Sequence, residues 1–328
     1  KITLIDGRIT YCGSQNCADE AFRIKAKYAP WVDIMLRLEG PVVDQMQLLF
    51  ASDWMQATGE VLAVFEREGA PVPLPAGRGG VDVVPAGGQG GCMTDEHAAG
   101  PALARGASAQ SLASVQGAPA PEPAPDAGQD METGAEPHAD AALPLGGFAA
   151  QVVGDGPTER RRSAPQLMST LIACSRGQLT ISTPYFVPDA TVLEALCAAA
   201  LRGVRVTLIL PERNDSWIVA GASRSNYARL LTAGVLIHEY RHGLLHAKTL
   251  TVDGELCFIG STNLDLRSFD LNFENNVLLQ DEAMTAAVMA RQQEYIEGSR
   301  PVTLAEVRAW PMHRRIWNNV LATLGPVL

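Results

Sequence analysis

The sequence of 328 residues predicts an α/β protein built from two pseudo-symmetric sheet-and-helix halves. Two observations lead to this prediction. One motif occurs twice, 247 residues apart, and the second half alternates strand-like with helix-like stretches. Such alternation is typical of a sheet covered by helices. We therefore expect each half to contribute one copy of the motif to a shared cleft.

The repeat preserves polar residues and glycines. Six of its sixteen positions are identical, and the mostly apolar residues between them are typical of a strand, a turn and a second strand. A repeat with a purely structural role would mainly preserve core residues, so this one indicates a site. Its identical positions are Lys1, Asp6, Gly7, Gly13, Ser14 and Asn16 in the first copy, and Lys248, Asp253, Gly254, Gly260, Ser261 and Asn263 in the second.

Periodicity and capping residues predict the elements around the repeat. In the first half, strands flank Gly7 and a helix starts with Pro41 at its first position and runs to about Thr58, before Gly59. The second half is predicted to contain a buried strand at 178–183, a helix capped by Asp189 and ended by Gly203, a strand at 204–210, a helix at 216–233 ended by Gly234, and a strand at 235–240.

Residues 71–147 differ in composition from the rest. They are rich in Ala, Gly and Pro and hold nine acidic residues against two arginines, so they carry −7 of the net charge of −10. We expect a disordered acidic insert there. It would separate the C-terminal part of the first half, residues 1–70, from the second half, residues 148–328. The rest of the chain is nearly neutral and lacks the basic stripe that nucleic-acid binding requires.

His246 adds chemistry to the second copy. It stands two residues before Lys248, so the two side chains project from the same face of a strand. In the first copy the equivalent His would lie two residues before Lys1. We therefore expect the chain to be a C-terminal fragment whose first half lacks its beginning.

At these residues the sequence resembles the phospholipase D superfamily, which has paired His-x-Lys-x-x-x-x-Asp motifs, and in particular the bacterial cardiolipin synthases. His246, Lys248 and Asp253 complete one motif, which continues into 260–274 as that family's does. The stretches 31–41, 53–60 and 182–189 are also similar. The resemblance implies two phospholipase D-like halves, with the first half N-terminally truncated.

The resemblance implies a phosphatidyltransferase of phospholipid biosynthesis. It would transfer a phosphatidyl group between two phosphatidylglycerol molecules, releasing glycerol through a phosphatidyl-histidine intermediate. Such a reaction needs a nucleophile, an acid for the leaving alkoxide and cations for the phosphate oxygens. Family precedent makes His246 the acid, although pseudo-symmetry leaves the reverse assignment open.

The other repeat residues have supporting roles in this interpretation. Lys1 and Lys248 would contact the phosphate, assisted by Asn16 and Asn263. Ser14 and Ser261 either join them or are structural. Glu274 is the candidate to orient a catalytic His, and Asp33 resembles its first-half counterpart. Asp6 and Asp253 belong to the motif. We expect them to hold an Asp-Gly turn rather than to touch substrate.

No cofactor or metal is predicted. His238, His242 and His246 are spaced by four, but their surroundings are strand-like rather than helical. The six cysteines lack metal-ligand spacing and fit reduced thiols. No apolar run reaches the roughly 18 residues of a membrane span. The expected partners are phosphatidylglycerol and a membrane surface, with no nucleic acid, and oligomeric state is open.

Two other functions fit the same residues. A phospholipase D-type hydrolase would use water as acceptor, and an inactive truncated remnant would act as a binding protein. With one of two imidazoles outside the chain, we expect the chain alone to be nearly inactive. The resemblance places the whole protein at a bacterial cell membrane, with its catalytic domain facing the cytoplasm and an anchor ahead of the first motif.

Overall fold

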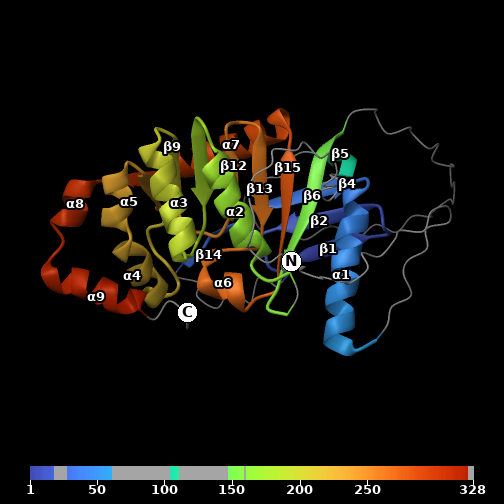
Figure 1. Ribbon diagram of the computed structural model, residues 1–328, viewed down its shortest axis with the longest axis horizontal. Coiled ribbons are helices and arrows are strands. Elements are labelled where there is room, and N and C mark those ends of the chain that lie inside the picture. The colour runs from blue at the N-terminus through green and yellow to red at the C-terminus, as the bar shows by residue number, and fades with distance from the viewer. Residues whose placement is uncertain (18–27, 61–103, 111–146, 159, 324–328) are drawn as a thin grey trace, which may run out of the picture.

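The computed structural model describes residues 1–17, 28–60, 104–110, 147–158 and 160–323. Strands and helices alternate through the second half, as the sequence predicts (Figure 1). The described strands are β1 Ile2–Ile5, β2 Ile9–Gly13, β3 Trp31–Val32, β4 Met35–Glu39, β5 Ala104–Gln110, β6 Phe148–Asp155, β7 Gln178–Ser182, β8 Phe186–Val187, β9 Arg205–Pro211, β10 Leu236–Tyr240, β11 Leu244–Leu245, β12 Thr249–Val252, β13 Leu256–Gly260, β14 Leu264–Asp265, β15 Glu274–Gln280 and β16 Ser299–Val302. The described helices are α1 Val42–Thr58, α2 Ser163–Cys174, α3 Ala190–Leu201, α4 Trp217–Ser225, α5 Tyr227–Ala233, α6 Leu266–Asp270, α7 Glu282–Glu297, α8 Leu304–Arg308 and α9 Met312–Ala322.

One sheet connects both halves. Its strand order is β1-β2-β4-β5-β6-β15-β13-β12-β7-β9-β10-β16. The neighbours β7, β9 and β10 run parallel, as strands linked by helical crossovers do. Two short parallel ladders lie outside this sheet, and one of them pairs β3 of the first half with β11 of the second. The halves are therefore joined through backbone hydrogen bonds at the sequence that leads into His246.

The two copies of the repeat form matching hairpins. Ile2 pairs with Cys12 and Ile5 with Ile9 in the first hairpin, while Thr249 pairs with Ile259 and Val252 with Leu256 in the second. Both turns have an Asp and a Gly with positive φ: 51° and 61° in the first turn, 54° and 78° in the second. This is the conformation for which Asp-Gly turns are favoured between antiparallel strands. The predicted strand, turn and strand are confirmed in both halves.

The halves pack against each other through apolar side chains. Leu36 and Leu38 of the first half belong to one buried cluster with Ile259 and Val277 of the second. A larger cluster lies between the sheet and helices α2, α3 and α5, whereas α7 covers the other face. Each cluster removes apolar surface from contact with water. This burial holds the two repeats in a fixed relation.

Most predicted helix boundaries agree with the structure. Asp189 caps α3 by accepting a hydrogen bond from the backbone N–H of Val192 at 2.9 Å. Pro41 is the N-cap of α1 rather than its first helical residue. The single helix predicted at 216–233 was wrong, because the chain forms α4 and α5 with a break at Asn226. Asn226 keeps helical φ and ψ of −84° and −13°, and its side chain makes no capping hydrogen bond to α5.

Most of the predicted insert lies outside the described residues. Within 71–147 the structure describes residue 147 and strand β5, which pairs with β4 and β6. The composition did not predict this strand. Among the described helices, none combines the length and apolar character needed to cross a bilayer.

Candidate active site

His246 is held by three residues of the first half. The backbone N–H groups of His246 and Ala247 both donate to the carbonyl of Val32 at 2.8 Å. The indole of Trp31 lies against the imidazole, with ring centroids 4.8 Å apart. Nδ1 of His246 lies 2.6 Å from Oδ1 of Asp33. The β3–β11 ladder thus fixes both the backbone and the ring of this histidine.

The pKa values of both members of this pair are shifted. Burial opposes ionisation of Asp33, but the hydrogen bond and charge of His246 outweigh it and lower the pKa of this carboxyl. Burial and the charge of Lys248 lower the pKa of His246. An ionised Asp33 accepts a hydrogen bond from Nδ1–H of His246, which leaves Nε2 for chemistry.

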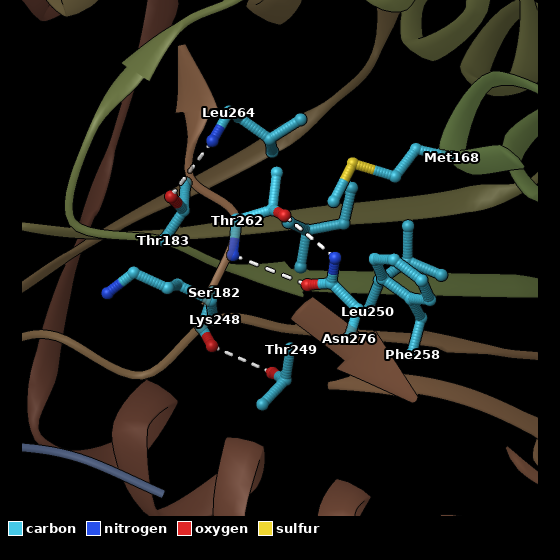
Figure 2. Close-up of a pocket in the computed structure, with 11 residues that line it drawn as sticks. Met168, Ser182, Thr183, Lys248, Thr249, Leu250, Phe258, Thr262, Leu264 and Asn276 are labelled. Atoms are coloured by element: carbon cyan, nitrogen blue, oxygen red, sulfur yellow. Dashed lines mark hydrogen bonds between the residues drawn. The ribbon is translucent and has the colours of Figure 1, made fainter. Parts of the chain in front are cut away.

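Lys248 is a buried amine beside this histidine. Lys248 is only 4% exposed, and its Nζ donates a hydrogen bond to the carbonyl of His246 at 2.7 Å. Burial lowers the pKa of Lys248 to about 7. Figure 2 shows Lys248 at the edge of a narrow pocket whose far side is formed by Met168 and Phe258. An amine in such surroundings gains an anionic partner readily, because its charge is poorly solvated.

Lys1 reaches the same site from the first half. Its backbone nitrogen donates to Oδ1 of Asn275 at 3.0 Å, and Asn275 is part of β15 in the second half. The positive charge of Lys1 contributes to lowering the pKa values of both His246 and Lys248. The lysines of the two repeats are therefore close enough to act on each other, as the repeat predicts.

The serine of each repeat is bound to an acid in the same way. Oγ of Ser14 donates to Asp33 at 2.6 Å, and Oγ of Ser261 donates to Glu274. In both halves the backbone N–H of the serine donates at 2.9 Å to the carbonyl of the residue after the acid, and the N–H of that residue donates at 3.0 Å to the serine Oγ. Asp33 and Glu274 are thus counterparts in geometry. Both hydroxyls are occupied by carboxylates, so their contact with phosphate stays a prediction.

The two asparagines of the repeat have different surroundings. Asn16 is exposed, and Asn263 is half-buried with Nδ2 donating to Ser268 at 3.1 Å. Within the described part of the chain, Oδ1 of Asn263 is buried without a hydrogen-bond partner. The structure thus shows a hydrogen bond that holds the side chain of Asn263, and the role of both asparagines in phosphate binding stays a prediction.

The motif aspartates lie at the turns, at the far end of their hairpins. The carboxylate of Asp253 accepts three backbone N–H groups, those of residues 176, 177 and 178, at 2.8 to 2.9 Å. Burial opposes its ionisation, but these hydrogen bonds lower the pKa of Asp253. Asp6 is exposed at the equivalent turn. Each is separated from its lysine by a four-residue strand, which spans about 13 Å, so neither touches the reacting groups.

Sequence reasoning missed two residues of the site. Trp31 contacts the imidazole, and Asn275 links Lys1 to the second half through Oδ1 and donates from Nδ2 to Sγ of Cys12 at 2.9 Å. A signal for Asn275 was present, because three polar residues, 274–276, stand directly before the apolar run 277–279. Nothing in the local pattern indicated that Trp31 faces a histidine 215 residues away.

Two matching hairpins that bring His246, Lys248 and Lys1 together define the phospholipase D-like class of domain. Residues 168–296 match the family model described as "Cardiolipin synthase, PLD-like domain". The matched stretch lies in the second half and contains His246 and Lys248, so this half is similar to PLD-like domains. It is 32% identical to cardiolipin synthase A of Serratia proteamaculans over 329 aligned residues, and 32% identical to cardiolipin synthase A of Proteus mirabilis.

Each of these alignments covers 100% of the chain and 54% of the relative, so the chain spans about half the length of the curated relatives it matches. Two solved structures are similar over part of the chain. Phosphatidylserine synthase of Haemophilus influenzae has a TM-score of 0.46 and 17% identity, with coverage of 55% of this chain and 48% of that one. Nuc of Salmonella typhimurium has a TM-score of 0.42 and 20% identity, with coverage of 47% and 97%.

Proposed function

We propose that this protein is a cardiolipin synthase that transfers a phosphatidyl group from one phosphatidylglycerol to another at a bacterial membrane. The observation that carries the proposal is the hydrogen bond of 2.6 Å between His246 and Asp33, made across the two halves beside a buried lysine. An imidazole with a fixed ring and a free Nε2 suits proton transfer to and from an alkoxide. Similarity to curated cardiolipin synthases supports the choice of substrate.

In the first step, an imidazole nitrogen attacks the phosphorus of phosphatidylglycerol. A P–N bond forms, the P–O bond to glycerol breaks, and the acid donates its proton to the departing glycerol oxygen. We assign the acid to His246. The nucleophile is then the histidine of the other motif of the pair, which in this family accompanies the lysine equivalent to Lys1. In the second step, the hydroxyl of another phosphatidylglycerol gives its proton to His246 and attacks phosphorus, so that the P–N bond breaks.

The acid role requires a protonated His246, and substrate supplies the condition for it. Burial and the charges of Lys248 and Lys1 lower the pKa of His246 in the free site. A bound phosphodiester carries a negative charge that offsets both lysines, so the pKa of His246 rises when substrate enters. Asp33 stabilises the imidazolium that results, because its carboxylate accepts a hydrogen bond from Nδ1.

Lys1 and Lys248 stabilise charge on the phosphorus centre. Burial lowers the pKa of Lys248 to about 7 and the charge of Lys1 adds to this lowering, so a bound anionic phosphodiester favours the ammonium form of Lys248. Negative charge that develops on the non-bridging oxygens of the transition state is then met by ammonium groups already in place. Asn263 adds an amide to this set.

The test is product formation by the protein expressed from its complete reading frame. With vesicles of phosphatidylglycerol, we expect cardiolipin and free glycerol in equal amounts, measured by mass spectrometry. Phosphatidic acid in place of cardiolipin would show a hydrolase instead. His246→Gln should reduce turnover by about 10²- to 10⁴-fold, and normal turnover by this variant would contradict the assignment of the acid.

A further inference from the structure

An exposed apolar surface covers α9 and the start of α4. Met312, Ile316, Trp317 and Val320 of α9 are between 47% and 75% exposed, and Trp217 of α4 is 62% exposed. The rings of Trp217 and Trp317 stack with centroids 6.0 Å apart and planes 5° from parallel. We call these five residues the α4–α9 patch. Contiguous exposed apolar surface of this kind marks an interaction site.

The patch faces outward because α9 packs on α4 by its opposite side. Asn318 and Leu321 are the residues of α9 buried against the protein, and Leu321 fills the space left by the missing side chain of Gly221. Residues 312, 316 and 320 follow each other at intervals of one helical turn. α9 is therefore an amphipathic helix whose second apolar face has no partner in the described part of the chain.

The charge around the patch is positive, which indicates an anionic partner. From residue 304 to the end, the sequence holds Arg308, Arg314, Arg315 and one acidic residue, Glu306. Both carboxylate oxygens of Glu306 lie 3.0 Å from Arg300, so this acid is neutralised within the protein. Arg308 and Arg315 are exposed and line a hollow between α8 and α9. An apolar helix face with arginines and tryptophan beside it is typical of binding in the interfacial plane of an anionic bilayer.

Exposed large apolar residues also occur on α1 and after α6. Phe50 and Trp54 of α1 are 42% and 43% exposed, and Leu271 and Phe273, after α6, are 60% and 50% exposed. Figure 1 shows α9, α4, α6 and the C-terminal end of α1 along its lower border, with the N-terminus between α6 and α1. The elements that carry these residues and the patch thus lie on both sides of the N-terminus, where Lys1 begins the chain.

We propose that the α4–α9 patch docks on the surface of an anionic phospholipid bilayer and turns the edge that carries the His246 site towards the lipid. The stacked tryptophans enter the interfacial region, while Arg308 and Arg315 contact lipid phosphates. A symmetric contact with a second copy is disfavoured, because it would place these arginines against each other. Docking needs no catalysis, so it stands apart from the proposed transfer reaction.

The test is sedimentation of the chain with vesicles. Binding should be strong with phosphatidylglycerol mixed into phosphatidylcholine, weak with phosphatidylcholine alone, and weaker at high salt. The double variant I316S/W317S should lower the apparent affinity about tenfold, since two apolar side chains no longer enter the bilayer. The double variant R308Q/R315Q should lose the preference for phosphatidylglycerol while it retains residual binding.

Leu201→Ser is the matched control. Leu201 is 74% exposed and lies at the C-terminal end of α3. The opposite end of α3 is the one near α6, because Arg162 pairs with both Asp189, the N-cap of α3, and Asp270 of α6. The control should bind vesicles like the wild type. Circular dichroism melting of every variant checks that the fold is intact.

Two results would overturn the proposal. One is undiminished vesicle binding by I316S/W317S. The other is a solution dimer, measured by light scattering, that the same variant dissociates, because the patch would then be an interface between copies. His246→Gln should still bind vesicles. Binding without cardiolipin formation would therefore count against the proposed function alone, whereas turnover of detergent-dispersed lipid without vesicle binding would count against docking alone.

Discussion

Asp33 and His246, 213 residues apart in sequence, share a hydrogen bond of 2.6 Å. The acid lies in the first half and the imidazole in the second, so the histidine cannot take its working orientation until the halves have packed. Ser14 donates to the same carboxylate oxygen, also at 2.6 Å. The first repeat thus completes the second, and a change in either half should be felt in the other.

Asp33→Asn should lower kcat by about 10- to 100-fold with little change in stability. The charge of Asp33 raises the pKa of His246, so its removal lowers that pKa further. If His246 must be protonated for the first step, activity is then lost at a lower pH than in the wild type. A pH–rate profile measures this shift. A reduced kcat with an unchanged alkaline limb would contradict an orienting and charge-stabilising role.

Lys248→Met should abolish transfer and stabilise the fold. The folded-state pKa of Lys248, about 7, is below its unfolded value of 10.5. Below pH 7 Lys248 is protonated in both the folded and the unfolded chain. The folded protein then bears the full free-energy cost of burying the charged ammonium. Between pH 7 and 10.5 the unfolded state binds more protons, so wild-type stability rises with pH by up to about 1.4 kcal/mol per unit. The advantage of Lys248→Met in urea unfolding should therefore be larger at pH 6.5 than at pH 8.5, and equal advantages would refute the shift.

Asp253→Ala should destabilise the protein by about 3 kcal/mol, because three backbone N–H groups lose a charged acceptor. Asp6→Ala is the matched control. It occupies the equivalent turn with nearly the same φ, 51° against 54°, so backbone strain cancels in the comparison. Its carboxylate is exposed, and the cost should stay near 1 kcal/mol. Turnover per folded molecule should survive in both variants; its selective loss in Asp253→Ala would show a direct role in chemistry.

Gly260→Ala and Gly13→Ala should each disturb the acid of their own half. An added Cβ would lie 2.3 Å from the carbonyl oxygen of Asn275 in one case and 2.2 Å from that of Ile34 in the other. These carbonyls directly follow Glu274 and Asp33, so the strand that bears the acid must move. We expect a loss of about 2 to 4 kcal/mol in unfolding free energy with a drop in activity. Gly177→Ala, whose Cβ would meet its nearest atom at 3.5 Å, is the control that should remain close to wild type.

Local pattern carried much of the prediction. The Asp-Gly turns, the alternation around them and the helix caps at Asp189 and Gly234 are short-range features, and the structure has each of them. The helix predicted at 216–233 is divided into two because the hydrogen bonding changes at Asn226, whose backbone keeps helical φ and ψ while its N–H donates to Ser223, three residues back. Whether a helix continues through a weak helix former in the middle of an apolar pattern depends on packing against neighbouring helices.

By itself, the sequence determined that two equivalent hairpins exist, that His246 and Lys248 share a strand face, and that Asp33 and Glu274 are candidate partners. Only the tertiary structure decided that Asp33 binds the histidine of the opposite half, that Trp31 covers the ring, and that α9 turns a second apolar face outward. The reason is physical: hairpins and helix caps depend on residues a few positions apart. Contacts across more than 200 residues depend on how apolar surfaces of two halves pack, and periodicity does not encode that relation.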